Sequence, residues 1–176
     1  MSPPPPYRLR LVRLTSETLA ALLRGDLQAA RELSGAALTP FFLGEAWLWR
    51  IRLDQLERDP ESAGWIARAV VAEPEGVVVG HIGFHGPPDA VGMVEVGYSV
   101  DPAHRRRGFA AAMLAAVLDR AAADPAVRMV RASIAPGNEA SLRTVARFGF
   151  VHTGEQWDDE DGLELVYEWD ANRGVR

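Results

Sequence analysis

The chain has 176 residues and a formal net charge of -5, and 48% of its residues are hydrophobic, so we expect one domain with a substantial core. The acidic balance gives no electrostatic support for nucleic-acid binding, and the lack of cysteine excludes disulfides, thiolate metal sites and a cysteine nucleophile. No apolar run approaches the ~20 residues of a membrane span and no signal-peptide core is present, so we expect a cytoplasmic protein without membrane contact.

Residues 1–7 are proline-rich and are predicted to form a flexible tail. Residues 8–170 are expected to form the single domain, and residues 171–176 a C-terminal tail. In the first half of the domain, apolar periodicity predicts one strand, three helices and a hairpin. These are the strand 8–14, the helix 15–23 capped by Thr15 or Ser16, the helices 26–33 and 40–56, and the hairpin strands 65–72 and 77–84.

The second half of the domain is expected to alternate strands and helices, with proline, glycine and Asp-Gly signals between them. The predicted order of elements favours a mixed α+β fold, a sheet with helices on both faces. The expected strands are 91–100, 127–135, 150–157 and 163–169, and the expected helices are 108–123 and 139–148.

The most informative motif is Arg105-x-x-Gly108-x-Ala110, which lies where a predicted strand ends and a predicted helix begins. The first amides of a helix have no partner within the helix, and the helix dipole is positive there. Such a site binds a diphosphate through backbone N–H groups, and the small residues let a ligand approach the backbone closely.

This pattern resembles the acetyl-CoA pyrophosphate loop of the GNAT N-acetyltransferase superfamily. A second stretch, Asn138–Arg143 followed by Phe148–Gly149–Phe150, and the segment Glu95–Tyr98 look like the branch that acetylates ribosomal-protein N-termini. The resemblance implies a mostly antiparallel, mixed sheet of about seven strands. It also implies an N-acetyltransferase that takes acetyl-CoA as co-substrate, needs no metal, and passes the acetyl group to a primary amine by direct attack in a ternary complex.

By the same resemblance, two strands, 95–100 and 130–135, splay apart to admit the pantetheine arm of acetyl-CoA. An amide near Tyr98 would then polarise the thioester carbonyl. Strand pairing and helix capping are the alternative roles for these residues. The expected cofactor-binding residues are Tyr98, Ser99, Val100, Arg105, Arg106, Arg107, Gly108, Phe109, Ala110, Ile134, Asn138 and Ser141.

The candidate general base is Glu95, because a carboxylate in a central strand is costly unless it is hydrogen-bonded or functional, and partial burial would strengthen it as a base. An exposed glutamate, or one paired with an arginine, is the alternative. Many GNAT enzymes carry a tyrosine seven residues after the asparagine that starts this helix, and that tyrosine acts as general acid for the leaving thiolate. This chain has Val145 at that position. Ser141 or water would then protonate the leaving thiolate, or it would leave unprotonated.

Several alternatives stay open at this stage. His81 and His85 share one face of a predicted strand and form either a metal pair or two separately satisfied histidines. The acidic turn 158–161 either recognises a cationic acceptor or is simply solvated. A non-catalytic acyl-CoA sensor is the second function, a Rossmann-type dinucleotide binder is a weaker third, and a homodimer is an open alternative. The acceptor and any preference for another acyl-CoA are not encoded in a readable motif.

Overall fold

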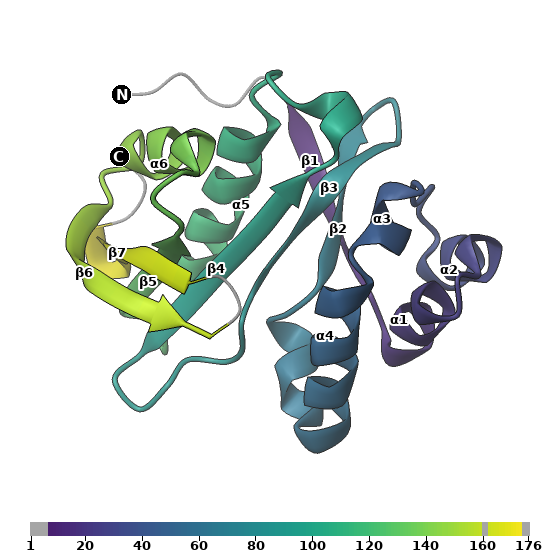
Figure 1. Ribbon diagram of the computed structural model, residues 1–176, viewed down its shortest axis with the longest axis horizontal. Helices are drawn as coiled ribbons and strands as arrows, with labels where there is room; N and C mark the ends of the chain where they lie inside the picture. The colour runs from purple at the N-terminus through teal and green to yellow at the C-terminus, as the bar shows by residue number, and fades with distance from the viewer. Residues whose placement is uncertain (1–6, 160–161, 174–176) are drawn as a thin grey trace.

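Seven strands form one sheet in a computed structural model that describes residues 7–159 and 162–173, so the residues predicted as the proline-rich tail and the tip of the acidic turn lie almost entirely outside the described part (Figure 1). The strand order is β1-β2-β3-β4-β5-β7-β6, and β4–β5 is the parallel pair in an otherwise antiparallel sheet. The strands are β1 (Arg8–Arg13), β2 (Arg68–Glu73), β3 (Val77–Phe84), β4 (Met93–Val100), β5 (Met129–Ile134), β6 (Val151–Asp158) and β7 (Gly162–Asp170).

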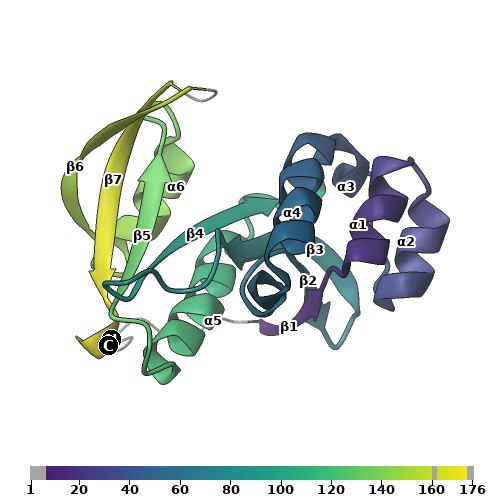
Figure 2. The same cartoon turned by 90° about the horizontal axis from the view of Figure 1, so that it is seen from below.

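Helices cover both faces of this sheet, as the order of elements predicts (Figure 2). Successive residues of β2 enter two different cores: Val70 packs with α5, and Val71 packs with the N-terminal helices. This alternation follows from the two-residue repeat of a strand. The helices are α1 (Ser16–Leu23), α2 (Leu27–Ser34), α3 (Phe41–Gly44), α4 (Ala46–Arg58), α5 (Phe109–Ala123) and α6 (Glu139–Ala146), with 3-10 turns η1 (Pro60–Gly64), η2 (Pro102–His104) and η3 (Ala171–Arg173).

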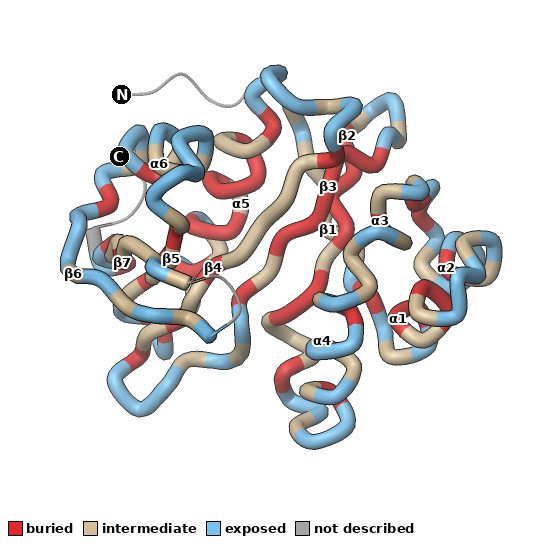
Figure 3. Tube along the Cα trace, viewed as in Figure 1, coloured by how far each residue is buried: buried red, intermediate tan, exposed pale blue. Residues whose placement is uncertain are grey.

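Buried residues concentrate along β2, β3 and the inner side of α5, whereas half or more of the residues of α2, α6 and β6 are exposed (Figure 3). The large buried side chains include Trp49 and Phe42, whose rings stack with centroids 5.8 Å apart. The core therefore lies along the central strands and α5, and α6 and β6, on the β5 side of the sheet, are more exposed.

The prediction of one helix over 40–56 is wrong, because the chain breaks at Glu45 into α3 and α4. Glu45 adopts φ -91° and ψ 22°, outside the helical region, directly after Gly44. Glycine is unfavourable in the interior of a helix, so Gly44 favours a break at this point. The break lets Glu45 reach β3, where its Oε2 lies 3.1 Å from Nε2 of His81.

Residues at both ends of the described chain pack on the domain. The ring of Tyr7, the last residue of the expected N-terminal tail, packs on Phe109 with centroids 4.2 Å apart. Ala171, the first residue of the expected C-terminal tail, is buried and its N–H donates to the carbonyl of Arg128. Both residues bury apolar surface against the core beside α5. The residues next to them in the sequence do not indicate this packing.

Candidate functional site

The parallel pair β4–β5 opens along its length, and this opening is the centre of the site. Strand pairing covers residues 93–95 of β4 and 129–131 of β5 and then stops. Beyond this point β4 pairs with β3 on its other side. The carbonyl of Glu95 accepts the N–H of His85, so by alternation the N–H and C=O of Tyr98 face the opening. The geometry provides the splayed strands that the resemblance implies.

The loop after β4 is held by a buried carboxylate. Asp101 accepts the hydroxyl of Thr39 at 2.6 Å and the N–H of Ala103 at 3.0 Å. Arg106 and Gly108 then adopt left-handed conformations with φ of 59° and 84°, and Gly108 is the residue before α5. A turn of this kind points successive N–H groups to one side and makes a cradle for an anion at the start of the helix.

A groove of about 790 Å³ lies against this helix start. Among the predicted cofactor residues, Arg105, Arg106, Gly108, Phe109 and Ala110 line it, and Val100 lies beside them. Arg107 does not line the groove. Its Nη1 lies 3.3 Å from Nδ1 of His104, and its guanidinium stacks over Phe109 at 5.4 Å.

Two arginines that sequence reasoning missed complete the groove. Arg143 of α6 and Arg147, the residue directly after α6, line it as well. Their spacing of one helical turn is the signal that could have found them, since residues four apart share a helix face. Arg143 also pairs with Glu139 at 2.9 Å. The groove is thus bordered by guanidinium groups from two elements and suits a polyanionic ligand.

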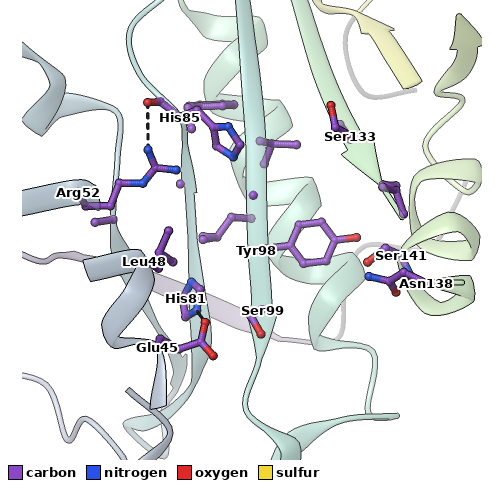
Figure 4. A pocket seen from close by; sticks show the side chains of 18 of the residues that line it. Glu45, Leu48, Arg52, His81, His85, Tyr98, Ser99, Ser133, Asn138 and Ser141 are labelled. Carbon is purple, nitrogen blue, oxygen red and sulfur yellow. Dashed lines mark hydrogen bonds and ion pairs between the residues drawn. The ribbon is translucent and has the colours of Figure 1, made fainter. Parts of the chain in front are cut away.

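A second hollow, a cavity of about 380 Å³, lies on the other side of the opening, between α4 and the sheet (Figure 4). Tyr98, Ser99, Asn138 and Ser141 line both the cavity and the groove. Ile134 lines the cavity. The side chain of Asn138 caps α6 by accepting the N–H of Ser141 at 3.1 Å, so its capping role is present. The two hollows meet at these four residues.

Glu95, the predicted base, does not line the cavity, and the imidazole of His85 does. Nδ1 of His85 lies 3.9 Å from Oε1 of Glu95, and Nε2 lies over the backbone of Gly97. Burial lowers the pKa of His85, the charge of Glu95 opposes this shift, and Arg52 adds to it. Sequence reasoning missed this arrangement because His85 lies in the turn after β3 and meets Glu95 only through strand pairing.

Arg52 and Gln55 hold His85 from α4. Nη1 of Arg52 and Nε2 of Gln55 both donate to the carbonyl of His85, at 3.3 Å and 2.7 Å. Burial lowers the pKa of Arg52, and Glu95 opposes this shift. Within residues 7–159 and 162–173, no carboxylate lies within 4 Å of its guanidinium.

His81 and His85 do not share a partner. His81 is buried against Phe41 and Trp49 and pairs with Glu45, whereas His85 faces Glu95. In the described ranges, no cluster of three or more histidine, aspartate or glutamate residues could hold a metal ion. Among those same residues, no helix is long and apolar enough to cross a membrane.

A family profile described as an acetyltransferase (GNAT) domain matches residues 8–151. The chain belongs to the GNAT acetyltransferase family. This confirms the family expected from the loop at Arg105–Ala110, and with it an enzyme that transfers acetyl groups to amines. The fold class is confirmed too, because the seven-stranded, mostly antiparallel sheet is shared with solved members.

Among relatives of this GNAT protein, an uncharacterized N-acetyltransferase from Bacillus subtilis, YjdG, is 27% identical over 82% of this chain and 86% of its own length. L-2,4-diaminobutyric acid acetyltransferase from Streptomyces anulatus is 35% identical over 54% of this chain and 52% of its own. The solved structure of Mycobacterium smegmatis RimJ with CoA-disulfide has a TM-score of 0.63 and 18% identity, covering 96% of this chain and 89% of that one. At that identity the structural match supports the fold alone.

Proposed function

We propose that this protein transfers the acetyl group of acetyl-CoA to a primary amine, on a protein N-terminus or a small molecule, while both substrates are bound. The observation that carries the proposal is the meeting of an arginine-lined groove and a separate cavity at the opening between β4 and β5. A long polyanionic donor and an amine acceptor can therefore approach one point from opposite sides.

The groove residues fit the diphosphate end of the cofactor. The amides of 106–110 would bind the pyrophosphate at the start of α5, and Arg105 and Arg106 would pair with phosphate oxygens. Arg147 would add a third guanidinium from the residue directly after α6. Arg107 keeps its contacts with His104 and Phe109, which we propose hold the loop in shape.

The pantetheine arm would follow the free backbone edge of β4, with Ile134 and Asn138 on its other side. The N–H of Tyr98 would donate to the thioester oxygen and stabilise the negative charge that develops when the amine attacks. The side chain of Ser99 lines the same region, while its backbone pairs with His81. This assigns the arm to the stretch of β4 that has no paired strand on its β5 side.

An acceptor amine arrives as an ammonium ion and must lose a proton before it attacks. We assign this proton to Nε2 of His85, because the imidazole lines the cavity and its lowered pKa favours the neutral form that can accept a proton. Glu95, whose Oε1 lies 3.9 Å from Nδ1, would act behind it through its charge and stabilise the imidazolium that forms. Glu95 thus keeps its predicted part in proton removal, but through His85.

Transfer then needs no covalent enzyme intermediate. The amine nitrogen attacks the carbonyl carbon, the C–N bond forms, and the C–S electron pair leaves with sulfur, while the second proton that the nitrogen must lose passes to water. Ser141 lies where the two hollows meet, at the end of α6 where the thiolate would leave, so it can pass a proton from water toward the leaving group. Val145, which occupies the position where many GNAT enzymes carry a tyrosine, is fully buried in the core and lines neither hollow.

The test is acetyl-CoA turnover with a panel of peptides with free N-termini, polyamines, amino acids including 2,4-diaminobutyrate, and aminoglycosides. Free thiol release above the no-acceptor rate should appear with one acceptor class. His85→Gln should lower kcat by about 100-fold or more, within the range for a lost general base. Acetyl-CoA binding without turnover of any amine would instead support the sensor, and failure to bind would refute the groove assignment.

A further inference from the structure

The hydroxyl of Tyr98 is buried and unpaired. Its oxygen is shielded from solvent, and no described residue completes a hydrogen bond to it. Ser141 and Thr144 approach it from α6 without reaching hydrogen-bond geometry. A buried polar group without a partner costs free energy, so such a group in a native fold calls for a ligand or a function.

The position of this hydroxyl indicates which ligand it would meet. Tyr98 belongs to the four residues that line both the groove and the cavity, and Figure 4 shows its ring pointing from β4 toward Ser141 and Asn138. The backbone of the same residue faces the opening where we place the thioester. The sulfur of the cofactor would therefore lie within the space between Tyr98 and α6.

We propose that the side-chain hydroxyl of Tyr98 donates a hydrogen bond to the sulfur of acetyl-CoA and delivers a proton to it as the C–S bond breaks. The inference rests on the proposed function and adds a catalytic residue to it. When the C–N bond has formed, the C–S electron pair moves to sulfur and takes the Tyr98 proton, giving the free thiol of CoA. The phenolate regains a proton from water through the Ser141 hydroxyl, so the enzyme returns to its starting state.

The chemistry of the group suits this step. Burial raises the pKa of Tyr98, and the nearby hydroxyls of Ser141 and Thr144 only partly offset the rise, so the phenol stays protonated and is available as a donor. The thiol that forms has a pKa of ~8.5, below that of the phenol, so the transfer is driven by the proton that the phenolate regains from water and not by the acidity of Tyr98 itself. Ser141 alone is a weaker acid than a phenol, and the Thr144 hydroxyl already donates to the carbonyl of Ala140 at 2.8 Å.

The first experiment compares the binding of CoA and of desulfo-CoA, which lacks the sulfur, to the wild-type protein, Tyr98→Phe and Tyr167→Phe. The assay pH is kept above the thiol pKa. Tyr167 is a matched control because it is a partly buried tyrosine of β7 that lines neither hollow. Tyr98→Phe should reduce the preference for CoA over desulfo-CoA by about tenfold, as expected for a hydrogen bond to a charged group, and Tyr167→Phe should leave it unchanged. Equal weakening of both ligands, or no change, would overturn the proposal.

The second experiment is turnover with the acceptor found above. Tyr98→Phe should lower kcat by about 10- to 100-fold with the acceptor KM within about twofold, since a thiolate is a tolerable leaving group even without an acid. The thermal midpoint should stay equal or rise, because the unpaired hydroxyl is removed and the ring is kept. An inactive wild-type protein would refute the proposed function, whereas an active one matched by Tyr98→Phe would refute only the role of Tyr98.

Discussion

Gly97→Ala tests the position of His85 with a single methyl group. A Cβ built on Gly97 would lie 2.9 Å from Nε2 of His85, while ordinary contact begins at 3.4 Å. The imidazole must therefore move by roughly 0.5 Å or swing toward solvent, which it can do because 48% of its side chain is exposed. Gly97 has an ordinary negative φ, so alanine adds no backbone strain.

The expected result is a loss of activity without a loss of stability. Catalytic groups must be held within about 0.5 Å of their productive position, and displacements of about 1 Å cost about 100-fold, so kcat should fall by about 10- to 100-fold. The free energy of unfolding should change by less than about 1 kcal/mol, because a half-exposed side chain yields to the added methyl. Affinity for acetyl-CoA should stay within about twofold, since the backbone of Gly97 faces β3 and not the opening.

Steady-state kinetics, calorimetric cofactor titration and thermal unfolding measure these three quantities. The double variant Gly97→Ala/His85→Ala separates the cause, because it should be no slower than His85→Ala alone if the methyl acts through the imidazole. Wild-type kcat in Gly97→Ala would refute the assignment of His85. An additional loss in the double variant would show that the methyl obstructs the substrate itself.

Three further predictions follow from the same contacts. The activity is expected to fall as pH drops through the pKa of His85. Arg52→Met removes a charge that lowers this pKa and should move the acid limb of kcat/KM to higher pH, whereas Glu95→Gln removes a charge that raises it and should move the limb to lower pH. Shifts of both variants in the same direction would contradict the arrangement. Gly83→Ala should cost about 1–3 kcal/mol in denaturant unfolding, because the new Cβ would meet the backbone nitrogen of Ala67 at 2.7 Å. Arg147→Gln should raise the KM for acetyl-CoA by about two- to fivefold at low salt and less at high salt, with the acceptor KM as the internal reference.

Local signals in the sequence were sufficient to predict the strands, the helix starts and the loop before α5. Apolar alternation located the seven strands, and capping residues located the helix starts, with Thr15 and Asn138 both accepting the expected backbone N–H groups. The loop before α5 was readable because its requirement is local: a glycine with positive φ at a helix start, next to arginines. These features depend on residues within a few positions of one another.

The cavity side of the candidate site was decided by contacts between distant parts of the chain. Glu45 meets His81 across 36 positions, and Thr39 meets Asp101 across 62. His85 faces Glu95 because β3 and β4 pair in one register, and a shift of one residue would turn Glu95 to the other face of the sheet. Periodicity predicts which residues share a face of one element, but it does not say which element will lie opposite.

The sequence by itself therefore determined the family, the order of elements and the glycine-led start of α5. Only the tertiary structure decided that His85 stands between Glu95 and the cavity, that Arg107 turns away from the groove, and that the hydroxyl of Tyr98 is left without a partner beside α6. The physical reason is that the first set arises from backbone hydrogen bonding along the chain, whereas the second arises from packing between elements, where each side chain takes the partner and the space that its neighbours leave.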